Sequence, residues 1–158
     1  MNLKRYVSKK IFFFIFSLSI FFYLTENCGA PQEPVDFAAG EHQCDYCRMG
    51  IADLRFRGEA ITKKGKIYRF DAIECMSSWS HEHHSEVDSV WVADFINQNQ
   101  WLRAEDAIYL QSQNLKSPMG AGLSAYPSEE ELKKAVEMYG GIRMNKIEMD
   151  AYVQKRKE

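Results

Sequence analysis

A pattern of two strands, a helix and a further strand occurs twice in this chain of 158 residues, and it constrains the fold more than any other feature. In its first occurrence, residues 55–62 and 66–70 have strand composition and are joined by a glycine-containing turn. A helix follows, which Asp71 opens with Glu74 three residues later in a capping-box arrangement. Its apolar positions share one helical face: Ala72, Cys75, Met76 and Trp79. Residues 87–93 then have the β-branched and aromatic composition of a strand.

The second occurrence repeats this order in the C-terminal half of the chain. Residues 107–111 and 123–126 have strand character and are separated by a glycine-containing loop. The next helix starts at Ser128 with a reciprocal cap from Glu131, and a glycine pair ends it. Its apolar face has the same spacing as the first helix: Leu132, Ala135, Val136 and Tyr139. Residues 142–149 form the last predicted strand, so the sequence predicts an α+β protein of two tandem ββαβ units.

The N-terminus has the organisation of a secretory signal. Residues 1–10 are basic, and residues 11–24 are apolar and uncharged. This apolar run falls short of the ~20 residues that span a bilayer as a helix. Cys28 follows closely, and the cysteine with its glycine neighbour resembles a bacterial lipoprotein processing site. We therefore expect acylation of Cys28, which would hold the protein to the membrane outside the cytoplasm.

The predicted organisation of the whole chain follows from these features. Residues 1–27 form the lipoprotein signal peptide and residues 28–41 a short tether. The first ββαβ unit covers residues 42–98 and the second covers residues 99–158. Within the second unit, the basic residues 155–157 are expected to form a solvated tail.

Composition and charge exclude several classes of protein. The chain is 46% hydrophobic and 27% charged, which is sufficient for a packed core. Its net charge is -2, and four basic residues stand against one acidic residue in the signal segment, so the remainder is acidic. An acidic surface argues against a nucleic-acid partner, because phosphate binding needs a basic face. The sequence also contains no nucleophile elbow, phosphate-binding glycine loop or H-E-x-x-H motif, and we expect no enzymatic activity.

The four cysteines point to a thiol with a function. Lipidation of Cys28 would leave Cys44, Cys47 and Cys75, an odd number that cannot all pair. Cys75 lies on the apolar face of the first helix, where a free cysteine behaves as a small hydrophobe. Cys44 and Cys47 form a C-x-x-C sequence, which is a weak signal with three competing interpretations.

A thiol-disulfide enzyme and a zinc site are the first two interpretations of Cys44 and Cys47. A redox pair favours the N-terminus of a helix, but the residues after Cys47 show no helical periodicity. A structural zinc site needs two further ligands, and the available histidines lie in the run His81–His84. That run closes the first predicted helix, where polar and cationic residues are favoured without any metal.

The third interpretation is a site for a soft metal ion. Thiolate and thioether donors favour Cu(I), and Met49 follows Cys47 at the spacing that places both on one side of an extended segment. Met119 lies in a loop rich in proline and glycine, away from any apolar face. Other methionines suit core filling: Met76, Met138 and Met144. Besides a metal carrier and a thiol-disulfide enzyme, a further hypothesis for the whole chain is a protein-binding lipoprotein with a structural Cys44–Cys47 crosslink.

Several short motifs, taken in order, resemble the NosL family of copper-binding lipoproteins, which are encoded with bacterial nitrous-oxide reductase. The matching segments are Cys47-Arg48-Met49-Gly50-Ile51, Tyr68-Arg69-Phe70-Asp71 with Cys75-Met76, Ser117-Pro118-Met119-Gly120, and Gly140-Gly141. The resemblance covers residues 44–149.

The resemblance implies a lipoprotein of two ββαβ units that binds one Cu(I) and passes it to the copper centres of the reductase. It implies that Cys47 and Met49 are ligands, with Met119 as a further thioether. Cys44 completes the C-x-x-C sequence and is included in the expected ligand set. The implied partner is a copper acceptor, either nitrous-oxide reductase or its assembly machinery.

Lipidation can be tested at Cys28. Because this residue closely follows the apolar segment, Cys28→Ala should abolish the incorporation of labelled fatty acid that the wild-type protein shows. Labelling that persists in the variant would disprove the lipid anchor at this position.

Overall fold

The computed structural model describes residues 33–157. The predicted signal peptide, Cys28 and the first part of the predicted tether lie outside the described residues. The first half contains η1 (Leu54–Phe56), β1 (Gly58–Thr62), β2 (Ile67–Phe70), α2 (Ile73–Glu82), β3 (Val87–Ala93) and β4 (Trp101–Arg103). The second half contains β5 (Ile108–Gln111), β6 (Leu123–Tyr126), α3 (Glu129–Tyr139), β7 (Ile142–Met144) and α4 (Lys146–Lys155). Among residues 33–157, no helix is both long and apolar enough to cross a membrane.

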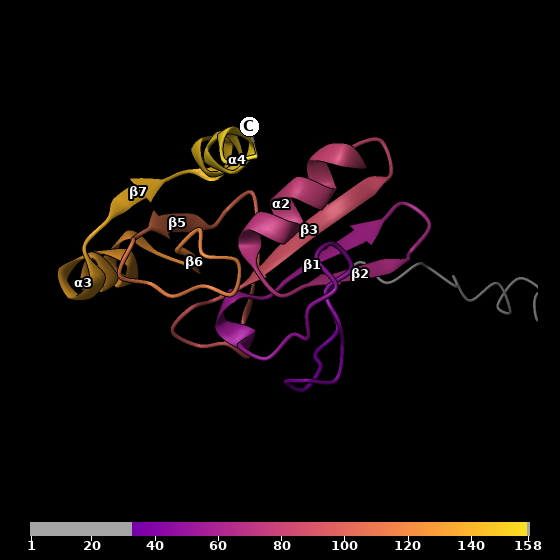
Figure 1. Ribbon diagram of the computed structural model, residues 1–158, viewed down its shortest axis with the longest axis horizontal. Helices are drawn as coiled ribbons and strands as arrows, with labels where there is room; N and C mark the ends of the chain where they lie inside the picture. Colours follow the sequence, from indigo (N-terminus) through magenta and orange to yellow (C-terminus); the bar gives the residue numbers. More distant parts are fainter. Residues whose placement is uncertain (1–32, 158) are drawn as a thin grey trace, which may run out of the picture.

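The two halves share one topology, and the predicted α+β fold of two ββαβ units is confirmed. The first sheet has the order β2-β1-β3-β4, and the second has the order β6-β5-β7. All of the strand pairs are antiparallel. In each sheet the first strand of the hairpin is central, and the strand after the helix pairs with its free edge. Figure 1 shows α2 across the first sheet and α4 beside α2, so the C-terminal helix returns to the first half.

The main hydrophobic core joins both halves. It includes Phe70 and Met76 from the first half and Tyr109, Met149 and Val153 from the second, all buried. The helix α2 approaches β1 closely, because a Cβ atom at Gly58 would lie 2.9 Å from the sulfur of Met76. Burial of such apolar side chains contributes roughly 25 cal/mol for each Å² removed from water. This contact fixes the position of α2 on the sheet.

A buried arginine holds the segment that leads into the first unit. Arg57 is 1% exposed, and its guanidinium donates to the carboxylate of Asp36 (2.9 Å) and to the carbonyl of Phe37 (3.3 Å). The indole of Trp101 donates to the same carboxylate (2.8 Å) and stacks under the guanidinium, 4.2 Å away. The residues just before the C-x-x-C loop are therefore attached to the first sheet.

The start of the first predicted strand is wrong. Residues 54–56 form the short 3₁₀ helix η1, and β1 begins at Gly58. The side chain of Asp53 accepts the N–H of Arg55, which stabilises a helical turn at this point. Strand β4, which pairs with β3, was not predicted at all, because three residues are too few for a periodic pattern.

The end of the last predicted strand, residues 142–149, is also wrong. Strand β7 ends at Met144, and Asn145 then opens α4 with a complete capping box to Glu148. The N-x-x-E signal for this helix is present in the sequence. Residues 155–157, predicted as a solvated tail, are exposed as expected. However, Lys155 is the last residue of α4, Arg156 donates to the carbonyl of Gly120 (3.4 Å), and Lys157 pairs with Glu82 (3.0 Å).

Both ends of α3 lie at the residues that the sequence predicted, but the predicted N-terminal cap is only half formed. Ser128 accepts the N–H of Glu131 with its hydroxyl, and Gly140 ends the helix with a φ of 63°. The return bond from the Glu131 side chain is not formed, so the cap is not reciprocal. Met138, predicted to fill the core, is 72% exposed, and that prediction is wrong.

The cap of α4 can be tested through stability. Asn145→Ala removes the side chain that accepts the N–H of Glu148, and it should lower the free energy of unfolding by about 1 kcal/mol. Urea titration followed by circular dichroism measures this change. Asn99→Ala, in an exposed turn, is the control and should change stability by less than about 0.5 kcal/mol. Equal effects of the two variants would show that the cap contributes nothing.

Candidate metal centre

The C-x-x-C sequence lies in a closed loop rather than on a helix. Gln43 and Gly50 form an antiparallel bridge, and the N–H of Cys44 donates to the carbonyl of Met49 (2.7 Å). Inside this bridge the N–H of Arg48 returns to the carbonyl of Cys44 (3.0 Å), with Arg48 in the left-handed region at a φ of 68°. The chain therefore turns back on itself between the two cysteines. This is the non-helical geometry that the sequence predicted.

The loop is attached to the edge strand of the first sheet. The N–H of Asp45 donates to the carbonyl of Arg69 (2.8 Å), and the Asp45 carboxylate accepts the N–H of Arg69 (2.8 Å). The Arg69 side chain in turn lies 2.9 Å from the carboxylate of Glu59, which is fully buried in β1. Backbone and side chain together hold the loop in register with β2. This register places the cysteines opposite the start of α2.

The predicted capping box at the start of α2 is wrong. The N-cap residue is Ala72, and no side chain caps this helix. Asp71 lies one residue too early to cap, and its carboxylate instead accepts a hydrogen bond from the thiol of Cys47 (3.4 Å). Glu74 turns toward the loop that contains Met119. Its Oε1 atom accepts the hydroxyl of Ser117 (3.2 Å) and the N–H of Ala121 (3.0 Å).

Four side chains meet between the loop and α2 to form what we call the thiol cluster. It consists of Cys44, Cys47, Asp71 and Cys75, whose ligand atoms all lie within 4.8 Å of one another. All three cysteines are free thiols. At metal–sulfur bonds of about 2.3 Å, donors around one ion lie within roughly 4.6 Å, so the cluster can hold a single ion with small adjustments. The Oδ2 atom of Asp71 is buried and has no hydrogen-bond partner among the described residues, which leaves it available to a cation.

The environment of the thiol cluster stabilises one thiolate. The pKa of Cys44 falls to about 6, because the thiol of Cys75 donates to its sulfur and the backbone N–H groups of Cys47 and Asp71 point toward it, against the effect of burial. The hydrogen bond to Cys44 and burial raise the pKa of Cys75. Burial, together with the neighbouring charges of Cys44 and Asp71, raises the pKa of Cys47 to about 11. A metal that binds here finds one thiolate and displaces protons from the other thiols.

The thiols and the candidate thioethers differ in their exposure to solvent. Cys44 and Cys75 are buried, at 0% and 1% exposure, whereas Cys47 is partly exposed. The thioethers are at the surface, with Met49 42% exposed and Met119 40% exposed. Met49 follows Cys47 in the same loop. The buried thiols are therefore shielded from solvent, whereas both candidate thioethers are accessible.

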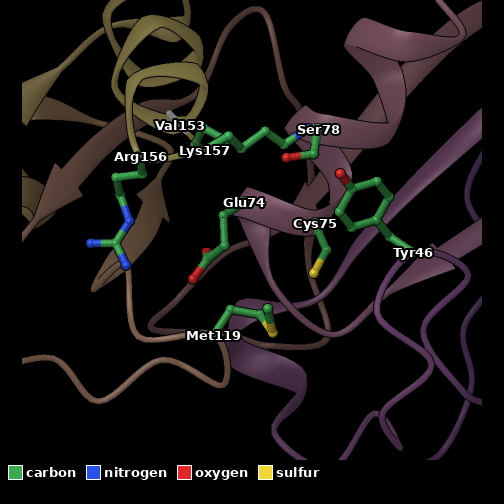
Figure 2. Close-up of a pocket in the computed structure, with 8 residues that line it drawn as sticks. All are labelled: Tyr46, Glu74, Cys75, Ser78, Met119, Val153, Arg156 and Lys157. Atoms are coloured by element: carbon green, nitrogen blue, oxygen red, sulfur yellow. The ribbon is translucent and has the colours of Figure 1, made fainter.

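Met119 and Cys75 share a cavity of about 240 Å³ between α2 and α4 (Figure 2). Figure 2 shows the two sulfur atoms pointing toward the same space, with Glu74 between them and α4. Eight residues line the cavity: Tyr46, Glu74, Cys75, Ser78, Met119, Val153, Arg156 and Lys157. Cys75 is thus the member of the thiol cluster that borders this cavity.

The histidine run at the end of α2 lies outside the thiol cluster. His83 is the C-cap residue, and its ring stacks on Trp79 with centroids 4.3 Å apart and planes 9° apart. His81 and His84 are exposed. These observations agree with the prediction of a polar helix end rather than a metal site.

Asp71 and Cys75 were missed as candidate ligands. Cys75 is buried in the core as predicted, but its sulfur also belongs to the thiol cluster. The sequence signal was present in the i, i+4 spacing of Asp71 and Cys75 and in the unpaired third thiol. The missing information was that the loop at residues 43–50 folds against this helix.

The fold and the thiol cluster define a small α+β protein with a buried, sulfur-rich group suited to a metal ion. The model of the NosL family matches residues 34–152, and the chain belongs to the NosL family. Its structure is similar to the crystal structure of the copper chaperone NosL from Shewanella denitrificans, with a TM-score of 0.63 and 22% sequence identity. The match covers 73% of this chain and 94% of that one, and it shows the shared fold. No curated protein matches the sequence.

Proposed function

We propose that this chain is a Cu(I) carrier, held outside the cytoplasm by a lipid on Cys28. The observation that supports this function best is the thiol cluster, in which three free thiols and an unpartnered carboxylate oxygen converge. Membership of the NosL family and a structural relative described as a copper chaperone support the same function. We expect a binding protein without catalytic activity.

The donor set favours Cu(I) over other biological cations. Thiolates and thioethers are soft ligands that select Cu(I), whereas Mg²⁺ and Ca²⁺ need oxygen ligands. Zinc is the main competitor, because three thiols and Asp71 could also surround Zn²⁺ as a tetrahedral set. The exposed Met49 and Met119 have no use in such a closed zinc site. A Cu(I) carrier could use them, because Met49 is the second residue after Cys47 and Met119 lines a cavity with Cys75.

In this proposal the ligand set is Cys44, Cys47, Met49 and Met119. Cys44 supplies the thiolate, which hydrogen bonds from neighbouring groups already stabilise. Cys47 is partly exposed and lies between the buried Cys44 and the exposed Met49 in the loop. The thioethers bind Cu(I) from the solvent side, where an acceptor protein can replace them. A site that is open on one side suits delivery, since the ion must also leave. We propose nitrous-oxide reductase or its assembly machinery as the acceptor.

A thiol-disulfide enzyme is the alternative from another class. Its nucleophile would be Cys44, whose lowered pKa favours the thiolate. However, Cys44 is 0% exposed, and attack on a substrate disulfide needs access to the sulfur. Substitution of Met49 distinguishes the Cu(I) carrier from the other hypotheses, because the carrier needs the thioether of this residue. A redox enzyme or a protein-binding lipoprotein with a Cys44–Cys47 crosslink does not need it.

The choice of metal is testable by anaerobic titration of the purified, reduced full-length chain. We expect one equivalent of Cu(I) to bind in competition with a Cu(I) chelator, and no binding of Mg²⁺ or Ca²⁺. Cys47→Ser should weaken Cu(I) binding by at least about tenfold, because oxygen replaces a soft donor. A protein that takes up stoichiometric Zn²⁺ but leaves Cu(I) with the chelator would contradict the assignment.

The role of the thioethers is testable with substitutions that keep side-chain volume. Met119→Leu and Met49→Leu should each weaken Cu(I) binding while the melting temperature of the apoprotein stays nearly constant, since leucine preserves volume but has no sulfur. Chelator competition and thermal unfolding measure the two properties. The matched control is Met138→Leu, which is 72% exposed on α3 and should leave binding unchanged. If Met119→Leu binds Cu(I) like the wild type, then Met119 is not a ligand.

A further inference from the structure

Met119 lies in a tight turn of the chain. The N–H of Gly120 donates to the carbonyl of Ser117 (3.0 Å), which places Pro118 and Met119 at the two central positions of a four-residue turn. Proline at the first of these positions fixes its own φ angle, so the backbone there has little freedom. The side chain of Met119 is 40% exposed, and packing therefore fixes it only in part. The direction of its thioether depends on how the turn is attached to the rest of the protein.

A single carboxylate oxygen binds both ends of this turn. Glu74 Oε1 accepts the hydroxyl of Ser117 (3.2 Å), the first residue of the turn, and the N–H of Ala121 (3.0 Å), the residue that follows it. The Ser117 hydroxyl in turn accepts the N–H of Gly122 (2.9 Å). Figure 2 shows the Glu74 side chain extending from α2 toward the loop that contains Met119. Removal of this oxygen would leave buried donors on both sides of the turn without an acceptor.

The other side chains that bind the turn come from different elements. They donate to the carbonyls of Gly120 and Ala121 at 3.3 to 3.4 Å, from β5, from α4 and from its C-cap residue: Gln111, Tyr152 and Arg156. Glu74 is thus the side chain that attaches the turn to α2. This helix also contributes Cys75, the next residue, to the thiol cluster.

The attachment of the turn to α2 matters for a methionine ligand. Glu74, Cys75 and Met119 line one cavity, and Figure 2 shows both sulfur atoms pointing toward the same space. Methionine has three rotatable side-chain bonds, and a flexible ligand loses this freedom when it binds a metal. A backbone that is already held in place reduces the cost of this ordering. One helical turn therefore holds a thiol of the cluster and the loop that presents the thioether.

We propose that Glu74 is a positioning residue for Cu(I) binding, which fixes the turn of residues 117–120 and thereby directs the thioether of Met119 toward the metal. Glu74 is not itself a ligand in this proposal, because Oε1 is occupied by the loop and Oε2 is buried. The inference rests on the proposed Cu(I) carrier with Met119 among its ligands. It explains why a carboxylate that has the spacing of a helix cap is turned toward a distant loop.

A double-mutant cycle tests whether Glu74 acts through Met119. The Cu(I) affinity of the reduced full-length chain is measured anaerobically by chelator competition for the wild type, Glu74→Ala, Met119→Leu and the double variant. Glu74→Ala alone should weaken binding by about tenfold or more, since loss of a group that orients a metal ligand typically has this effect. In the Met119→Leu background the same substitution should cause no further loss, because the thioether is already absent. Two effects that multiply in the double variant would overturn the inference.

A conservative variant and a spectrum distinguish positioning from a general structural role. Glu74→Gln keeps an oxygen that can accept both donors, so its Cu(I) affinity should stay within about threefold of the wild type. The copper X-ray absorption spectrum of Glu74→Ala should match that of Met119→Leu, because both sites lose the same sulfur. A wild-type spectrum for Glu74→Ala, or a Glu74→Gln variant as weak as Glu74→Ala, would contradict the proposal.

Ser117→Ala tests the same contact from the loop. It removes the hydroxyl that Glu74 accepts, and it remains informative if Glu74→Ala fails to fold. It should also weaken Cu(I) binding, and only while Met119 is present. The matched control is Ser128→Ala, which removes the cap hydroxyl of α3 and lowers stability away from this turn. This control should leave both the Cu(I) affinity and the spectrum unchanged.

The outcomes separate this inference from the proposed function. If the wild-type chain does not retain Cu(I) against the chelator, the carrier is overturned, and this inference with it. If Met119→Leu alone has no effect, Glu74 has no ligand to position and the inference fails. Independent effects of Glu74 and Met119 overturn the positioning role alone, and the Cu(I) carrier remains.

Discussion

The close packing of α2 on β1 is the contact on which the rest of the structure depends. Gly58 permits it, because any side chain at this position would collide with Met76. This packing places Asp71 and Cys75 at a fixed point above the sheet, where the loop of residues 43–50 meets them. It also presents Glu74 to the loop that contains Met119. One helix start thus contributes to the thiol cluster, to the thioether loop and to the cavity between them.

Buried charged side chains bind the segments that precede and contain the cysteine loop to the first sheet. Glu59 is fully buried, with Arg69 at 2.9 Å and the backbone N–H of Val35 at 2.9 Å, and burial raises its pKa despite these partners. A buried ion pair gives little net stability because desolvation offsets its attraction, but removal of one partner leaves the other charge uncompensated. The loop that contains Cys44 is bonded to Arg69 in β2 through Asp45. Through Asp45 and Arg69, the network connects the cysteine loop to the buried carboxylate of Glu59.

The regular elements could be predicted from the sequence, and the exceptions have physical reasons. The hairpin of β1 and β2, strand β3 and the helix α3 follow from local periodicity and caps, which depend only on neighbouring residues. Asp71 and Glu74 have the spacing of a capping box, but contacts with Cys47 and Ser117 from distant segments take both carboxylates away from the helix. At residue 145 the opposite error occurred, because the apolar pattern suggested a strand where a capping box begins α4.

The sequence by itself determined the soft character of the candidate site and the exposed residues proposed as its donors. Cys47 and Met49 are two residues apart, and Met119 lies in a loop of proline and glycine, so local sequence was sufficient to select them. Only the tertiary structure decided that Asp71 and Cys75 join Cys44 and Cys47, and that α4 closes a cavity above them. These groups come from segments up to 113 residues apart (Cys44 to Lys157). Side chains so distant in sequence are brought together by packing of the core, which no local pattern encodes.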